Sequence, residues 1–225
     1  MKMANKFLTL TTAASALALS SMAMAYEPGE ISLRVGATHV APDASSDAVK
    51  LNGTALPAKV DVDSNTQLGL TVEYFVTQNF GVELLAATPF EHTAEGKGAL
   101  AGLDIADVKQ LPPTLSAVYH FNPIGDFQPY VGAGLNYTIF FSEDMSSDLE
   151  AALGTGGDVS LDNSFGYALQ AGFDFHLNDK WLLNASVRYI DISTTADIDL
   201  DTGDKVSVDV DIDPFVYTLS AGYRF

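Results

Sequence analysis

Apolar and polar residues alternate along most of the chain with a period of two. In residues 66–76, TQLGLTVEYFV, apolar side chains occupy the even positions from 68 to 76, and Gln, Gly, Thr and Glu occupy the odd positions from 67 to 73. This period is typical of a β-strand that has one apolar and one polar face. The pattern predicts eight strands, at residues 31–38, 66–76, 80–86, 115–121, 131–141, 165–177, 181–189 and 215–225. Helical spacing is confined to residues 146–153, where we expect one short helix.

The connectors between the predicted strands alternate between short and long. Short, turn-rich connectors lie at residues 77–79, 122–126 and 178–179, and long ones at 41–65, 91–110, 142–163 and 192–213. An even number of strands then brings both chain ends to the side with the short turns. This is the plan of a bacterial outer-membrane barrel. The alternative is a soluble barrel of the lipocalin type, which would turn its apolar face inward.

Aromatic residues of the apolar parity gather near both ends of the strands. One band lies beside the short connectors and the chain end: Tyr74, Phe80, Tyr119, Phe121, Phe175, Trp181, Tyr223 and Phe225. A second band lies at the opposite strand ends: Phe141, Phe165, Tyr189 and Phe215. A membrane barrel requires such girdles at its two lipid–water interfaces. We therefore predict an all-β fold, an eight-stranded antiparallel transmembrane barrel with short periplasmic turns and long extracellular loops.

The N-terminal segment has the three-part order of a secretory signal peptide. Lys2 and Lys6 precede an apolar stretch at residues 7–19, and residues 23–25 form an A-x-A cleavage site. We expect cleavage after Ala25, export to the periplasm, and a single barrel domain at residues 26–225. The remaining sequence has no apolar run of 18 residues or more, so no membrane-spanning helix is expected.

Charge and residue composition exclude several classes of function. The chain carries 11 Lys and Arg against 29 Asp and Glu, a net charge of −18, so it lacks the basic surface that a nucleic-acid-binding protein needs. There is no cysteine, which excludes disulfides and thiolate chemistry. Asp174 and His176 share the inward face of one strand, and we interpret them as a structural ion pair rather than catalytic groups. No histidine pair has metal-ligand spacing, so we predict neither an enzyme nor a cofactor or metal site.

The polar parity predicts an ion network inside the barrel. In a membrane barrel these side chains line the lumen, where opposite charges neutralise one another. The charged members are Arg34, Glu73, Glu83, Asp174, Arg188 and Arg224. Eight glycines share this parity; they either give the long side chains room or leave a passable lumen.

The last long connector reverses this arrangement. Its inward parity is apolar: Ile190, Ile192, Ile198, Leu200, Val208, Val210 and Ile212. Its outward parity is aspartate, which is costly in lipid, so this hairpin must rise above the bilayer. Its apolar face forms either a ligand pocket at the mouth or the core of a lid. The sequence around these aspartates does not have the glycine and the glutamate that an EF-hand loop requires at fixed positions, so we expect no specific calcium site.

Three prolines fall near one place on the predicted wall. Pro89 ends the third strand, and Pro112 and Pro113 begin the fourth. Proline has no N–H for the strand ladder, so these residues either open the wall sideways or simply end the strands above the membrane. We expect inward Leu85, below them, to close the floor of the mouth.

Several stretches, taken together, resemble the OmpW family of small outer-membrane proteins. They are NTQLGLT at 65–71, GVELLAATPF at 81–90, LPPT at 111–114, PYVGAGLNYT at 129–138 and SAGYRF at 220–225. The resemblance implies an outer-membrane barrel with an apolar pocket and a role in moving small hydrophobic solutes across the membrane. It also implies the alternative of a surface receptor for bacteriocins or phage.

Other partners follow from this location. We expect outer-membrane lipid, lipopolysaccharide and the barrel assembly machinery. Phe225, a terminal aromatic on the outward parity, resembles the assembly signal of outer-membrane strands.

Overall fold

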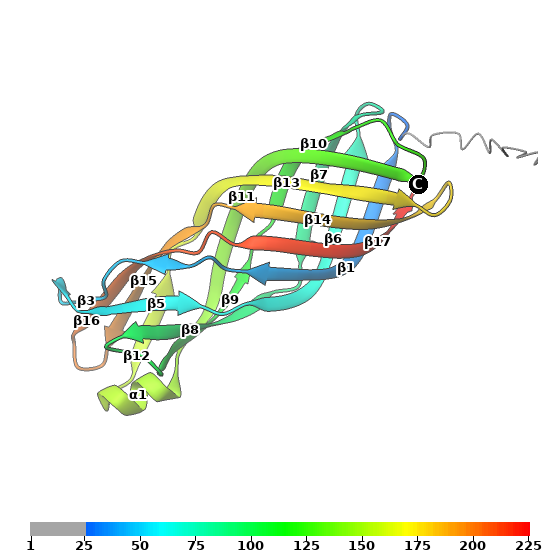
Figure 1. Ribbon diagram of the computed structural model, residues 1–225. Coiled ribbons are helices and arrows are strands. Elements are labelled where there is room, and N and C mark those ends of the chain that lie inside the picture. The colour runs from blue at the N-terminus through cyan, green and yellow to red at the C-terminus, as the bar shows by residue number, and fades with distance from the viewer. Residues whose placement is uncertain (1–25) are drawn as a thin grey trace, which may run out of the picture.

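Eight long strands form the wall of a closed antiparallel barrel (Figure 1). The computed structural model describes residues 26–225; the predicted signal peptide lies outside the described residues. The wall strands are β1 (Ile31–Ala41), β6 (Asn65–Phe75), β7 (Phe80–Ala87), β10 (Thr114–His120), β11 (Phe127–Met145), β13 (Ser164–His176), β14 (Trp181–Ile190) and β17 (Phe215–Arg224). Their order is β10-β7-β6-β1-β17-β14-β13-β11, and pairing of β10 with β11 closes the ring. The predicted fold is confirmed.

The wall follows the predicted alternation of side chains. Outward residues such as Leu84, Leu115 and Trp181 are exposed, whereas inward Glu73 and Glu83 are buried. Aliphatic and aromatic side chains outside and charges inside are the reverse of a soluble barrel, as lipid around the wall requires. Among the described residues, no helix is long and apolar enough to cross a membrane.

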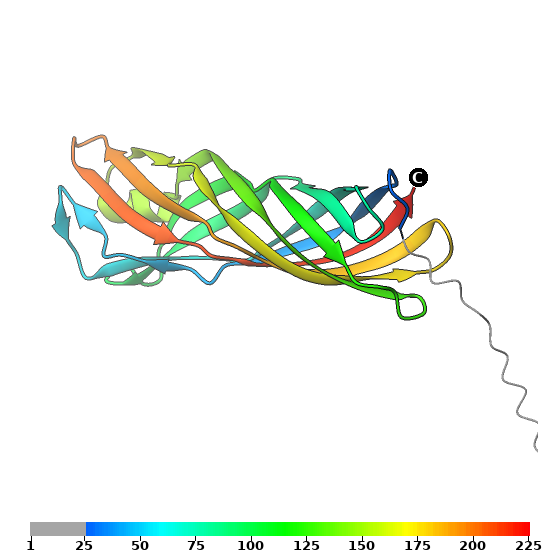
Figure 2. The ribbon, with the colours of Figure 1, turned by 90° about the horizontal axis from the view of Figure 1, so that it is seen from above.

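The two ends of the barrel differ. The chain end and the short turns lie together at one end (Figure 2), which we call the periplasmic end. The opposite, extracellular end carries further strands where the sequence predicts loops. One group, β5 (Ala58–Val62), β8 (Phe90–Gly98) and β9 (Asp104–Leu111), extends the wall from β11. A separate sheet has the order β12-β15-β16-β3-β4, with β2 paired to β16.

The strands of this second sheet are short. They are β2 (Ser45–Ser46), β3 (Lys50–Leu51), β4 (Thr54–Ala55), β12 (Gly157–Leu161), β15 (Ser193–Leu200) and β16 (Lys205–Asp211). The long connectors are therefore partly strands. The sequence predicts this only for the last of them, the alternating hairpin that follows Ile190. The other connectors also alternate in part, with charged residues outward and apolar residues toward the centre, as strands in water do.

The predicted helix is confirmed as α1 (Ser147–Leu153). Ser146 is its N-cap, and its side-chain oxygen accepts a hydrogen bond from the backbone N–H of Leu149 at 3.1 Å. The helix ends at Gly154, whose φ of 71° is in the left-handed region that glycine adopts without strain. Leu149 is the buried residue of α1, and it packs toward the space between the two extracellular sheets.

Candidate ligand cavity and the ion network below it

An apolar cavity of about 300 Å³ lies at the extracellular end, between the wall extension and the second sheet. Its lining comes from β3, β5, β8, β9, β11, β12, β15, β16 and α1 and is almost entirely aliphatic. A cavity of this size and character is typical of sites for small apolar ligands.

The structure brings most of the predicted mouth residues into this lining. They are Ile198, Leu200, Val208, Val210 and Ile212, all buried. The aspartates that alternate with them on β15 and β16, at positions 197, 199, 209 and 211, are exposed, as the sequence predicts.

The other three predicted mouth residues do not line the cavity. Ile190 and Ile192 belong to the buried apolar cluster that surrounds Val208 and Val210. Leu85 is buried on the inner face of β7 in the barrel wall. β14 ends at Ile190, before β15 of the second sheet begins, and β7 ends at Ala87, before β8 begins. The three side chains therefore do not reach the lining.

The sequence did not predict most of the cavity wall. Val49, Val60, Ile105 and Val108 come from segments predicted as loops, and Leu149 comes from the predicted short helix. The signal was present in residues 104–111, DIADVKQL, where apolar residues at positions 106 and 108 share a parity with Gln110. Charged residues in the same segment obscured it.

Two polar side chains of the wall extension face this apolar space. His92 on β8 is 6% exposed and Gln110 on β9 is 2% exposed, and both line the cavity. The Nδ1 atom of His92 lies 2.7 Å from the backbone carbonyl oxygen of Asp63. Within residues 26–225, the Nε2 atom of His92 and the Oε1 atom of Gln110 have no hydrogen-bond partner.

Burial fixes the chemistry of the histidine. Desolvation lowers the pKa of His92 below its usual value, although the backbone and carboxylate of Asp63 act in the opposite direction. The ring is therefore neutral at neutral pH. Its Nδ1–H donates to the Asp63 carbonyl, which leaves Nε2 as a hydrogen-bond acceptor that faces the cavity.

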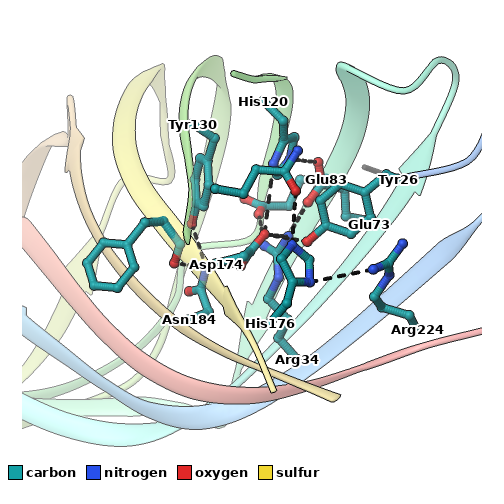
Figure 3. Close-up of polar contacts among 12 residues, drawn as sticks. Tyr26, Arg34, Glu73, Glu83, His120, Tyr130, Asp174, His176, Asn184 and Arg224 are labelled. Atoms are coloured by element: carbon teal, nitrogen blue, oxygen red, sulfur yellow. Dashed lines mark hydrogen bonds and ion pairs between the residues drawn. The ribbon is translucent and has the colours of Figure 1, made fainter. Parts of the chain in front are cut away.

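The lumen nearer the periplasmic end holds a dense ion network (Figure 3). Arg34 lies at its centre: its Nη1 donates to Glu83 Oε2 at 2.8 Å, and its Nη2 contacts both Glu73 and, at 3.5 Å, Asp174. Arg188 donates to the other oxygen of Glu83 at 2.7 Å. Five of the six predicted network residues are thus connected, and all five are buried.

Tyr26, which the sequence reasoning did not single out, fills the periplasmic end of this network. Its hydroxyl donates to Asp174, and its ring stacks on Phe75 with centroids 3.7 Å apart. The same ring packs edge-on against His120, and the guanidinium of Arg224 lies 4.6 Å from its centroid. The lumen is therefore filled by side chains at this level.

The sixth predicted residue, Arg224, forms an ion pair with Glu30, which directly precedes β1. The interpretation of Asp174 and His176 as an ion pair needs correction. The Nε2 atom of His176 lies 3.0 Å from the amide oxygen of Gln128 instead. Arg224 and His176 lie beside each other at the periplasmic end of the barrel, with Arg224 Nη1 3.5 Å from His176 Nδ1.

Gly81 shows what the inward glycines provide. A Cβ atom at this position would collide with the carboxylate of Glu73, which is held by Arg34 and by His120 Nε2 at 2.7 Å. The glycine therefore makes room for a network side chain, which is the first of the two interpretations given above.

The three prolines border a break in the strand ladder. Leu85 pairs with Thr114 near the end of β7 and at the start of β10, and Phe90 pairs with Gln110 at the start of β8 and near the end of β9. Between these pairs, residues 86–89 face residues 111–113 without a ladder pair in the described part of the chain. Pro89 is exposed and Pro112 is buried.

Phe225 follows β17 at the periplasmic end. Its ring is 70% exposed and packs edge-on against Tyr223, with centroids 4.8 Å apart. Its backbone N–H donates to the carbonyl of Ile31 at 2.9 Å, so the strand ladder continues to the last residue.

The comparisons with known proteins agree with this architecture. The model of the OmpW family matches residues 27–225. This chain belongs to the OmpW family. Outer membrane protein W of Escherichia coli (strain K12) is 45% identical over 224 residues, covering 98% of this chain and 100% of that protein. Outer membrane protein W of Vibrio cholerae is 44% identical over 210 residues, covering 92% and 93%.

A solved structure extends the agreement to three dimensions. The crystal structure of the outer membrane protein OprG from Pseudomonas aeruginosa matches with a TM-score of 0.83 and 45% identity, over 90% of this chain and 98% of that one. As a member of the OmpW family, the protein is an outer-membrane barrel of Gram-negative bacteria, surrounded by membrane lipid, and it is not an enzyme. The predicted family, fold and location are confirmed.

Proposed function

We propose that the protein lets small hydrophobic molecules cross the outer membrane. The observation that carries this proposal is the apolar cavity of about 300 Å³ at the extracellular end of a lumen that is filled, nearer the periplasm, by buried ions. Binding in the cavity lowers the free energy of an apolar molecule, because the molecule leaves water there. A charged lumen offers it no comparable gain.

This contrast favours a sideways exit. A molecule in the cavity would pass between residues 86–89 and residues 111–113, where the wall strands have no ladder pair, and would enter the lipid directly. Pro89 and Pro113 keep that stretch from pairing because neither has a backbone N–H. Leu85, buried at the last pair below the break, closes the floor against water.

A more distant relative supports an apolar solute. The dibenzothiophene metabolism operon protein PahQ of Pseudomonas aeruginosa is 28% identical over 85% of this chain and 87% of that protein. Its name associates it with the metabolism of an apolar aromatic compound. We extend that solute class, small apolar molecules, to this chain as part of the proposal.

A second candidate function is a surface receptor. The extracellular sheets present a row of exposed aspartates on β15 and β16, with carboxylates at positions 197, 199, 209 and 211. Such a surface suits contact with macromolecules such as a bacteriocin or phage protein, or cation-bridged contact with lipopolysaccharide phosphates.

Uptake in cells tests the two functions against each other. Cells that lack a protein of this family are compared with the same cells producing this chain, using an apolar fluorescent probe and a panel of phages and bacteriocins. Faster probe entry supports passage. Unchanged entry together with altered phage or bacteriocin sensitivity would contradict passage and favour the receptor.

A further inference from the structure

We infer that the cavity selects apolar molecules that carry a single hydroxyl group, and that His92 and Gln110 together bind that hydroxyl. The inference rests on the proposed function, because it names the chemistry of the molecule that enters.

The two side chains are neighbours on one face of the β8–β9 pair. The register places Phe90 opposite Gln110 and His92 opposite Val108, so His92 and Gln110 are diagonal neighbours pointing to the same side. Diagonal neighbours of this kind are within reach of long side chains. The ring of Phe90 stacks on that of His92, with centroids 6.3 Å apart, and holds it against the cavity wall.

Their polar atoms are unusual for a protein interior. Buried polar atoms nearly always have a hydrogen-bond partner, and an exception calls for an explanation. Here two exceptions, His92 Nε2 and Gln110 Oε1, occur side by side in a lining that is otherwise almost wholly apolar. The explanation we give is that their partner is a bound molecule.

The geometry specifies what that molecule must offer. His92 Nε2 is an acceptor, since Nδ1–H is committed to the Asp63 carbonyl at 2.7 Å. The amide of Gln110 presents either its oxygen or its NH2 group after a half-turn about its last torsion. A hydroxyl is both donor and acceptor: its O–H donates to His92 Nε2 while its oxygen accepts from the Gln110 NH2.

Other ligand classes fit less well. A hydrocarbon leaves both polar groups unsatisfied. A carboxylate has no hydrogen to donate to Nε2, and an ammonium or a carboxylate brings an uncompensated charge into an apolar lining. The favoured ligands are therefore phenols, naphthols and simple apolar alcohols.

The matched ligand pair 2-naphthol and naphthalene tests this. The purified protein in phosphatidylcholine nanodiscs is titrated with each compound, and binding is followed from methyl NMR signals of Ile198 and Val208, which line the cavity. Empty nanodiscs give the partition of each compound into lipid. We expect about tenfold tighter binding of 2-naphthol, consistent with one or two net hydrogen bonds.

Variants separate the hydrogen bonds from the apolar contacts. His92→Phe and Gln110→Met keep the shape of the lining and remove the orphan atoms, so both should fold normally. Each should reduce the preference for 2-naphthol to about twofold or less and leave naphthalene binding unchanged or tighter. Thr194→Val is the control: Thr194 also lines the cavity, but its hydroxyl already donates to the Asp162 carbonyl at 2.7 Å, so its loss should not change the preference.

A measurement on the wild-type protein complements the variants. The ¹⁵N signal of His92 Nε2 should shift on addition of 2-naphthol and stay unchanged with naphthalene. If both compounds bind equally and the preference is the same in every variant, the inference is wrong while hydrophobic passage stands. If neither compound binds the wild-type protein, the inference and the proposed function both fail.

Discussion

Leu85 on β7 pairs with Thr114 on β10, and this is the last ladder pair of those two strands before the extracellular sheets begin. The next pair in this direction joins Phe90 to Gln110 on β8 and β9. Four residues therefore face three across the interval, and Pro89, Pro112 and Pro113 lie within it. The unequal count and the missing N–H groups both prevent a continuous ladder.

Restoring that ladder should slow the passage of apolar molecules. Replacing Pro89 with Val and Pro113 with Thr returns two backbone N–H groups to the interval. We expect the rate of hydrophobic probe uptake to fall several-fold, while the amount of heat-modifiable, folded barrel stays normal. Pro57→Thr, at the far end of the β5–β8 pair, is the control and should leave uptake unchanged. Equal uptake by the double variant and wild type would show that the exit lies elsewhere.

Removal of the central arginine should strongly destabilise the barrel. Arg34→Met leaves Glu73, Glu83 and Asp174 buried without their shared partner. Loss of one member of such a buried network costs about 3–5 kcal/mol, so the free energy of unfolding in urea and lipid vesicles should fall by that amount. Lys205→Gln removes an exposed ion pair with Asp199 and should cause no measurable change. Equal stability of both variants would mean that the lumen charges are not held by Arg34.

Loss of the terminal residue should affect assembly more than stability. Phe225 is 70% exposed, so its ring buries little surface in the folded barrel. We predict that Phe225 is an assembly signal, so deleting it should nevertheless lower the amount of folded protein in the outer membrane. Phe225→Tyr keeps an aromatic end and should restore the yield. An undiminished yield from the deletion would refute an assembly role for this residue.

The hydroxyl preference of the cavity should disappear at acidic pH. Burial lowers the pKa of His92 below the usual histidine value, so the ring is neutral at pH 7 and takes up a proton only at more acidic pH. Protonation turns Nε2 from an acceptor into a donor and brings a charge into the lining. In the described chain, Asp63 is the charged side chain nearest the ring, with Oδ1 3.6 Å from Nδ1.

This dependence has a definite sign. The ratio of 2-naphthol to naphthalene affinity should be greatest at neutral pH and should fall toward one as the pH is lowered through the depressed pKa of His92. His92→Phe should show a low ratio at every pH. A wild-type ratio that stays constant while the ¹⁵N signals of His92 report its protonation would exclude His92 as the acceptor.

Alternation along the chain was sufficient to predict the barrel and its orientation. In the wall, lipid demands one apolar face per strand, so segments such as residues 66–76 carry an unbroken pattern. Apart from the last hairpin, the extracellular strands were predicted as loops, because strands in water tolerate mixed patterns. In β8, the sequence FEHTAEGKG has few apolar residues to mark a strand.

The candidate site could be predicted only in part for a related reason. The Ile198 and Val208 face was visible because it lies on one hairpin of consecutive residues. The polar pair was not, because His92 and Gln110 become neighbours only through the register of β8 against β9. Tyr26 and Glu30 precede the first wall strand, so no strand pattern marks their contacts with Asp174 and Arg224.

The central claim, that apolar molecules pass through the extracellular cavity, is tested most directly by filling that cavity. Val208→Trp places a large side chain in the lining without touching the lumen ions or the proline interval. Initial uptake of an apolar fluorescent probe is compared in cells producing wild-type protein, the filled variant or neither, with folding checked by heat-modified mobility. We expect fast uptake with the wild type and background uptake with the filled variant. Wild-type uptake by a correctly folded Val208→Trp barrel would contradict the claim.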